Sequence, residues 1–210
     1  MAGMCSSEAR AVLRTGQQVL RTGQQVLRTQ RLALRPLAEE HLEDEVALDA
    51  DPEVMRYLGS GRPRGRDEVT RLHRDRLAVA ELVPGLGFWA GFAGTEFVGW
   101  WILEPLVRDG QVVAGQAELG YRLLRRFWRQ GLASEGAREL VRHGFADLGL
   151  RRIFAQTMAV NAASRATMAA VGLRYERAWR QDWPEPIAGS EHGEVEYAIT
   201  REQWLAGSPA

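Results

Sequence analysis

The spacing of apolar and polar residues predicts helices and strands in mixed order, with one strongly amphipathic helix near the middle of the chain. From Gly131 onward, apolar or small residues recur every three to four positions, as they do on the buried face of a helix. They are Leu132, Ala133, Gly136, Leu140, Val141, Gly144, Phe145 and Leu148. A strand is predicted immediately before this helix, over residues 117–124, and the connecting loop is rich in arginine.

The rest of the pattern predicts an α+β domain. Strands are expected at residues 32–37, 87–93, 97–104, 153–158, 173–179 and 194–199, with a hairpin turn at 94–96. Helices are expected at 39–50, 52–58, 66–82 and 162–171, the last closed by Gly172 as its cap. No linker divides residues 31–205, which we therefore expect to form a single domain, with 206–210 as a C-terminal tail.

Residues 1–30 form an extension with an internal repeat. The sequence VLRTGQQ occupies residues 12–18 and again 19–25, and a third copy begins at 26–29 before diverging at Gln30. Each complete copy contains a glycine, and its adjacent apolar residues do not supply the seam of a coiled coil. We expect a duplicated lead-in to the first strand, with residues 1 to about 28 mobile or loosely helical and dispensable for chemistry.

Charge and composition exclude several classes of function. The 27 basic residues balance 27 acidic ones, and every basic residue is arginine. A catalytic lysine and a lysine-containing phosphate loop are thus excluded, and nucleic acid is disfavoured as the main ligand. The arginines of residues 62–66 form a local cluster suited to an acidic partner.

Cysteine content and hydropathy favour a cytoplasmic protein without a membrane partner. Cys5 is the single cysteine, so no intramolecular disulfide is expected. No apolar run reaches the roughly 20 residues of a membrane span, and the N-terminus lacks the apolar core of a secretory signal. No cluster of histidine and cysteine predicts a metal site.

The arginine-rich loop lies at the start of the amphipathic helix, where backbone N–H groups point outward. A helix N-terminus carries unpaired donors and a partial positive charge, and is therefore suited to bind an anion. This loop resembles the pyrophosphate loop of the GNAT superfamily of acyl-CoA N-acyltransferases, in the form typical of its RimJ/RimL-like branch. The residues in register are Trp128, Gly131, Ala133 and Glu135. The resemblance continues elsewhere, at residues 31–37, 51–57, 118–121, 161–164 and 172–173.

The resemblance covers roughly residues 31–205 and implies a GNAT fold with a mixed central sheet of about six to seven strands flanked by helices. It implies direct transfer of an acetyl group from acetyl-CoA to a primary amine, either a protein N-terminus or a small molecule, without a metal. Homodimerisation remains open, as do a longer or succinyl donor and the identity of the amine. The residues expected to bind the co-substrate are Tyr121, Leu123, Arg126, Arg129, Gln130, Gly131, Leu132, Ala133, Ser134 and Asn161.

Two departures from the family pattern affect the expected site. Arg129 replaces the first glycine of the loop, and we expect it to adopt an ordinary φ angle. Met168 stands where many GNAT enzymes have a tyrosine that protonates the leaving thiolate. The RimJ/RimL-like branch lacks that tyrosine and has a serine three residues after the asparagine, here Ser164. Ser164 is therefore the candidate for this role, its alternative being to cap its helix together with Asn161.

Glu118 is the best-placed general base, because its strand bends toward the thioester in this fold. Strand alternation puts it on the face opposite Tyr121, and an exposed structural role is its alternative. His73, expected on a solvated helix face, and His192 are lesser candidates, and deprotonation through water remains possible. His143 is expected to be structural, and Trp183 is a candidate for the acceptor pocket.

The sequence also bears on two other classes of function. The glycines at 85, 87 and 91 superficially resemble a dinucleotide fingerprint, but they lead into a strand instead of a helix, which excludes that motif. A non-catalytic acyl-CoA-binding module of the same fold stays open, because Arg129 and Met168 depart from the pattern.

Overall fold

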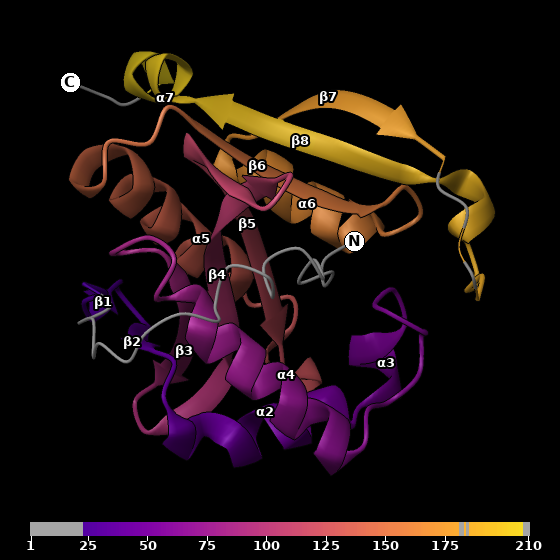
Figure 1. Ribbon diagram of the computed structural model, residues 1–210. Coiled ribbons are helices and arrows are strands. Elements are labelled where there is room, and N and C mark those ends of the chain that lie inside the picture. The colour runs from indigo at the N-terminus through magenta and orange to yellow at the C-terminus, as the bar shows by residue number, and fades with distance from the viewer. Residues whose placement is uncertain (1–22, 181–182, 184, 208–210) are drawn as a thin grey trace.

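One mixed sheet with helices on both faces makes up the protein (Figure 1). The computed structural model describes residues 23–180, 183 and 185–207. The strands are β1 (Leu27–Arg28), β2 (Ala33–Pro36), β3 (Gly87–Ala93), β4 (Glu96–Arg108), β5 (Gln111–Leu123), β6 (Arg152–Met158), β7 (Arg174–Trp179) and β8 (Glu194–Thr200). Their order is β1-β2-β3-β4-β5-β6-β8-β7, and only β5 and β6 pair in parallel. The predicted fold class is confirmed, with eight strands instead of six to seven.

The helices divide between the two faces. On one side lie η1 (Glu39–His41), α2 (Leu42–Asp49), α3 (Pro52–Met55) and α4 (Arg66–Val79). On the other lie α5 (Leu132–Arg142), which continues into the π-helical turn η3 (His143–Asp147), α6 (Ala162–Val171) and α7 (Arg201–Gly207). We call these the α2/α4 face and the α5/α6 face. No helix in the described part of the chain is long and apolar enough to cross a membrane.

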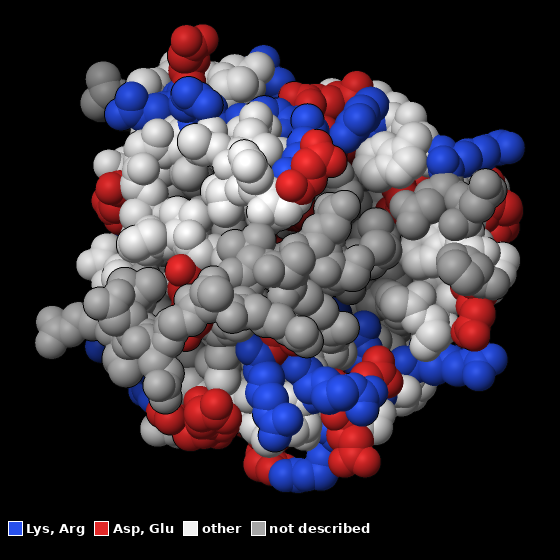
Figure 2. Space-filling model, in the orientation of Figure 1, with Lys and Arg blue, Asp and Glu red and all other residues white. Residues whose placement is uncertain are grey.

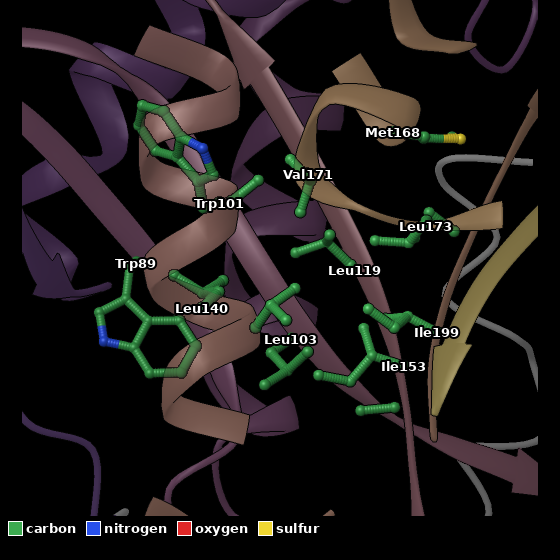
Figure 3. Packing of buried hydrophobic residues seen from close by; sticks show 14 of the residues in the cluster. Trp89, Trp101, Leu103, Leu119, Leu140, Ile153, Met168, Val171, Leu173 and Ile199 are labelled. Carbon is green, nitrogen blue, oxygen red and sulfur yellow. The ribbon is translucent and has the colours of Figure 1, made fainter. Parts of the chain in front are cut away.

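An apolar core fills the α5/α6 face, as the stripe on the amphipathic helix predicts. Figure 3 shows Leu140 of α5 among side chains of the sheet such as Leu103 and Ile153. The stripe contains glycine because Trp101 packs directly on the helix: a Cβ at Gly136 would lie 2.5 Å from the Trp101 ring. Trp101 also donates from Nε1 to the Ala133 carbonyl at 3.1 Å, which fixes α5 on the sheet.

Buried charges accompany the apolar residues on the α2/α4 face. Asp49 is fully buried and forms ion pairs with Arg64, Arg76 and Arg122, whose side chains come from a loop, α4 and β5. Burial alone would raise the pKa of Asp49, but the three guanidinium groups lower it below its usual value. A carboxylate is buried here only because cations surround it on several sides.

His73 belongs to the same region, and its expected position on a solvated helix face is wrong. The side chain is 1% exposed, and its Nδ1 lies 2.7 Å from Glu45 Oε2. The arginine cluster at 62–66 is also less available than expected, since Arg64 is paired with Asp49 and Glu68 and Arg66 with Glu43.

Both ends of the predicted domain extend further than expected. Residues 23–28 were assigned to a mobile segment, yet Leu27 is buried in strand β1. Gln24 Nε2 donates to the Phe88 carbonyl at 3.1 Å, and the Gln25 carbonyl accepts from Trp89 Nε1 at 3.0 Å. At the other end α7 was not predicted, and it packs Trp204 against Phe145. The earlier residues of the repeat lie outside the described part.

Candidate functional site

The parallel strands β5 and β6 separate part-way along their length. They pair over residues 116–118 and 152–154, with Glu118 opposite Phe154, and both strands then continue without further pairing to each other. The backbone of β5 over 119–123 therefore presents an open edge toward β6. Such an edge can hydrogen-bond an extended ligand in the manner of an added strand. We call this opening the β5/β6 split.

The loop that follows β5 is shaped by two left-handed residues. It runs through η2 (Arg125–Phe127) to Gly131, the residue that precedes α5. Arg129 has φ 61° and Gly131 has φ 75°. The expectation of an ordinary φ angle at Arg129 is therefore wrong: this position takes the conformation for which glycine is favoured. A non-glycine residue there costs on the order of 1–3 kcal/mol, so the surrounding structure must enforce it.

The start of α5 offers backbone donors with no partner in the described part of the chain. The first hydrogen bond of the helix runs from Glu135 N to the Gly131 carbonyl at 3.0 Å. The N–H groups of Leu132, Ala133 and Ser134 precede it and point out of the helix end, while the Ser134 hydroxyl bonds to the Gly131 carbonyl at 2.9 Å. These N–H donors, the positive end of the helix dipole and the exposed Arg129 side chain together suit the binding of a diphosphate group.

Side chains from inside and outside the loop hold it in this shape. Trp128 Nε1 donates to the Leu123 carbonyl at 2.8 Å, and Gln130 Nε2 donates to the Arg126 carbonyl at 2.8 Å. Arg126 itself pairs with Glu96 at 2.8 Å. The side chains of Gln130 and Arg126, both predicted to bind the co-substrate, are therefore engaged within the protein.

A contact from the N-terminal segment completes the loop and was missed from the sequence. Glu135 accepts from Thr29 Oγ1 at 2.6 Å, from the Arg31 backbone N at 2.8 Å and from Arg31 Nε at 2.6 Å. Arg31 Nη1 also donates to the Gln130 carbonyl at 2.9 Å. Glu135 thus has a structural role, as expected, but through residues more than a hundred positions away rather than through the helix dipole alone.

Glu118 projects from β5 toward the α2/α4 face, where Glu104 of β4 lies directly opposite it. Burial and the neighbouring Glu104 carboxyl raise the pKa of Glu118 to about 8. Burial likewise raises the pKa of Glu104 to about 7, although Arg76 opposes the shift. Two carboxyls facing each other resist ionising together, so near neutral pH this pair can take up and release a proton.

A groove of about 350 Å³ opens on the same side of the sheet, next to Glu118. Gln116 lies two residues before Glu118, and Phe154 pairs with Glu118 across the strands; both line the groove. The remaining lining residues are Leu106, Arg108, Arg152, Gln156, Glu176, Arg177 and Glu196. Most of their charges pair among themselves, since Glu196 accepts from Arg152 and Arg177 at 2.8 Å and from Gln156 at 2.7 Å.

Asn161 and Ser164 lie at the start of α6, near the β5/β6 split. Asn161 Oδ1 accepts from the Ser164 backbone N at 3.2 Å, so Asn161 caps this helix. Asn161 Nδ2 donates to Thr157 Oγ1 at 3.1 Å. The hydroxyl of Tyr121 reaches the same turn, where it donates to the Ser164 carbonyl at 3.1 Å and lies 3.4 Å from Ser164 Oγ. The split thus brings Tyr121 close to Asn161 and Ser164, which lie about forty residues further along the sequence.

The other candidates fall outside this site or stay untested. His143 is buried between Asp147 and the Gly85 carbonyl, which fits its expected structural role. His192 is exposed beside Glu191. Trp183 does not line the groove, and its place in the acceptor pocket stays a prediction. No three acidic, histidine or cysteine side chains in the described ranges gather as a metal site would require.

The amino-acid sequence is similar to those of known proteins. Residues 31–174 match the family model described as an acetyltransferase (GNAT) domain. The chain is 46% identical over 178 residues to the FsC-acetyl coenzyme A-N(2)-transacetylase of Aspergillus fumigatus, which covers 83% of this chain and 76% of that protein.

Solved structures have the same fold at lower identity. RimL, a ribosomal L7/L12 alpha-N-protein acetyltransferase in complex with coenzyme A, is 19% identical with a TM-score of 0.70, covering 84% of this chain and 98% of that chain. Spermidine N-acetyltransferase from Vibrio cholerae, in complex with CoA and spermine, is 16% identical with a TM-score of 0.68, covering 83% and 98%.

Proposed function

The chain belongs to the GNAT family of acetyltransferases, and from this premise we propose that it acetylates the primary amine of a small molecule. The family gives the enzyme class and the acetyl-CoA co-substrate. The acceptor and the roles of individual residues are our proposal. The observation that carries it is the Glu104–Glu118 pair: Glu118 lies at the last pair before the β5/β6 split, opposite the groove-lining residue Phe154.

Acetyl-CoA supplies an activated thioester, and two parts of the chain are suited to hold it. The free N–H groups of Leu132, Ala133 and Ser134 would bind its diphosphate, with Arg129 adding positive charge. The open edge of β5 from Tyr121 to Leu123 would pair with the amides of the extended arm, and Asn161 would add a side-chain amide. Binding energy from these remote contacts places the thioester without any covalent enzyme intermediate.

Glu118 would act as the general base for the acceptor. An amine attacks only when it is neutral, so a proton must leave the ammonium group before or during attack. A carboxylate with a pKa near 8 is a stronger base than an ordinary glutamate, and its environment on the α2/α4 face provides that shift. Glu104 maintains the shift, because its own negative charge disfavours the ionised form of Glu118.

The groove favours a small acceptor that carries a carbonyl or carboxylate near its amine. Its volume of about 350 Å³ lies within the range of small-molecule sites. Arg108 lines it without an ion-pair partner in the described part of the chain, and can thus bind an acceptor oxygen. The fungal relative is named for transfer to an N(2) nitrogen. In amino-acid numbering that nitrogen is the amine on the carbon that bears the carboxyl group.

The test is thiol release by the full-length chain with acetyl-CoA and a panel of amines. The panel contains amino-acid esters and amides, polyamines and peptides with free N-termini. We expect turnover with the amino-acid derivatives, and Arg108→Ala should raise their KM while leaving the KM for acetyl-CoA unchanged. Preference for peptides would instead support the protein N-terminal acceptors of the RimJ/RimL-like branch, and would contradict the small-molecule proposal.

Melting curves with acetyl-CoA, CoA, NADH and ATP separate binding from turnover. A ligand at about 100 times its dissociation constant stabilises the fold by ~2.7 kcal/mol. We expect a shift with acetyl-CoA and CoA alone. Such a shift without thiol release from any amine would identify a non-catalytic acyl-CoA-binding module and overturn the proposal.

A further inference from the structure

Tyr121 and Glu118 lie three residues apart on β5 and therefore point to opposite faces of the sheet. Glu118 faces the α2/α4 side, whereas Tyr121 packs against the apolar core of the α5/α6 side. Both belong to the part of β5 at or beyond its last pairing with β6. The two side chains thus flank the β5/β6 split from its two sides.

The Tyr121 hydroxyl spans the distance from β5 to the first turn of α6. It lies 3.1 Å from the Ser164 carbonyl oxygen and 3.4 Å from Ser164 Oγ. Thr167, one turn further along the helix, is also near enough to interact with it. The hydroxyl therefore ends among hydroxyl groups on the α5/α6 side of the split, while the rest of the ring is buried in apolar surroundings.

Acetyl transfer needs a proton donor for the leaving thiolate as well as a base for the attacking amine. The thiolate that leaves must be protonated, and Met168, at the position where many relatives have a tyrosine, has no proton to donate. Met168 is also buried, with 2% of its surface exposed. Ser164 is a poor acid, because an alkyl hydroxyl holds its proton far more tightly than a thiol does. A phenol, with an ordinary pKa of about 10, is much closer to a thiol at about 8.5.

We propose that Tyr121 is the proton donor to the leaving thiolate, with Ser164 as the hydroxyl that orients it; this rests on the acetyl transfer proposed above. The acceptor nitrogen forms a bond to the acetyl carbon, and the carbon–sulfur bond breaks. The phenol O–H proton passes to sulfur, and the phenolate regains a proton from solvent. The nitrogen loses two protons in all, one from the ammonium group before attack and one from the tetrahedral intermediate, and both leave through Glu118 to solvent on the opposite face. One proton taken from solvent replaces that of the phenol, so the cycle releases one proton and charge balances.

The Tyr121 phenol is protonated before the thiolate forms. Burial raises the pKa of Tyr121 to about 12, although hydrogen bonds with Ser164 and Thr167 oppose the shift. The group is thus fully protonated at neutral pH. Burial beside it raises the pKa of the leaving thiol as well, so the difference between the two acids stays near that between a free phenol and a free thiol. A thiolate formed beside it meets a hydrogen-bond donor in a site of low polarity, where such a bond is strong.

The experiment compares Tyr121→Phe with wild type, and uses Tyr175→Phe as the matched control because Tyr175 is exposed on the edge strand β7. Loss of a general acid typically lowers the rate by about 10²–10⁴-fold. We expect a kcat loss of that order for Tyr121→Phe, with the KM for acetyl-CoA and the melting shift with CoA unchanged. Tyr175→Phe should behave as wild type. Ser164→Ala should give a smaller kcat loss, since the phenol remains.

A second acetyl donor distinguishes proton donation by Tyr121 from a purely structural role in which Tyr121 holds β5 and α6 together. An acetyl thioester of an acidic aryl thiol needs little protonation of its leaving group, so the deficit of Tyr121→Phe should shrink with that donor. An equal loss with both donors, accompanied by a lower melting temperature and a raised KM, would show a brace and overturn the proposal. Wild-type kcat in Tyr121→Phe would also overturn it. Absence of turnover in wild type would instead reject the proposed function.

Discussion

The two faces of the sheet are built by different means. The α5/α6 face is mainly apolar, with Trp101 and Leu140 at its centre. The α2/α4 face combines apolar residues with a buried ion network around Asp49 and Arg122. On the surface seen in Figure 2, charges of both signs are interspersed among the described residues instead of forming a patch of one sign. The concentration of charge inside the α2/α4 face is therefore the distinctive electrostatic feature.

This difference matches the two halves of the proposed reaction. The acceptor arrives as a cation and gives up a proton, which requires carboxyls with adjusted pKa values, and these lie on the α2/α4 side. The thioester arm is extended and needs an open strand edge and helix N-termini, which the α5/α6 side supplies. Buried charge is costly, and it stands where amine chemistry requires it.

Removing the base should have the largest effect. Glu118→Gln keeps the shape of the side chain but cannot accept a proton, so kcat/KM should fall by about 10²–10⁴-fold. Glu202→Gln, at an exposed position of α7, is the control. Steady-state thiol release measures both. Near wild-type activity in Glu118→Gln would remove the assigned chemistry from the α2/α4 face.

Cutting into each core should destabilise the fold by similar amounts but with different pH dependence. Asp49→Ala leaves the buried Arg122 without a carboxylate partner, while Arg64 keeps Glu68 and Arg76 keeps Glu45, and it should cost about 3–5 kcal/mol. Leu140→Ala should cost about 2–5 kcal/mol through its cavity. Urea unfolding gives both free energies.

The pH dependence then separates the two variants. The folded pKa of Asp49 is lowered, so the stability it contributes is present above its unfolded pKa and is lost as the pH falls through the folded value. The gap between wild type and Asp49→Ala should therefore narrow in acid, while the Leu140→Ala gap stays constant. Equal behaviour of the two variants would contradict the distinction between the faces.

Gly136→Ala tests the close packing on the apolar side. The added Cβ would lie 2.5 Å from the rigid Trp101 ring, so the helix must shift. Overpacking of this kind costs about 1–3 kcal/mol. Gly207→Ala, where a Cβ meets nothing within 4 Å, is the control. A melting temperature equal to wild type in Gly136→Ala would show that α5 is less tightly fixed than described.

Arg129→Gly should have the smallest effect on folding. Glycine adopts a positive φ angle without steric cost, so the variant should be as stable as wild type or more stable by about 1 kcal/mol. The KM for acetyl-CoA should rise only modestly, through loss of one charge. A large loss of stability would mean that the arginine side chain, not the backbone conformation, holds the loop.

Local sequence patterns predicted the elements and the shape of the apolar face. The spacing of Leu132, Gly136 and Leu140 identified a buried helix face, and glycine and asparagine marked the ends of α6. The unpaired backbone donors at the start of α5 could be predicted for the same reason, because a helix leaves its first N–H groups free wherever it begins. That they bind an anion stays a prediction.

Long-range contacts could not be predicted in this way. Arg122 lies 73 residues from Asp49, and Thr29 lies 106 residues from Glu135. His73 stands in a helix rich in arginine, so its pattern indicated solvent, but Glu45 of α2 pairs with both His73 and Arg76 inside the fold. Arg129 adopts a positive φ angle because tertiary contacts enforce it against the residue's own preference.

The most direct test of the account is the pH dependence of kcat/KM for wild type and Glu118→Gln. With Glu118 and Glu104 carrying pKa values of about 8 and about 7, wild-type activity should rise with pH and level off above this range. Glu118→Gln should be slow and should lack that rise. A wild-type profile that is flat across this range, or the same rise in Glu118→Gln, would contradict the assignment of the base to the α2/α4 face.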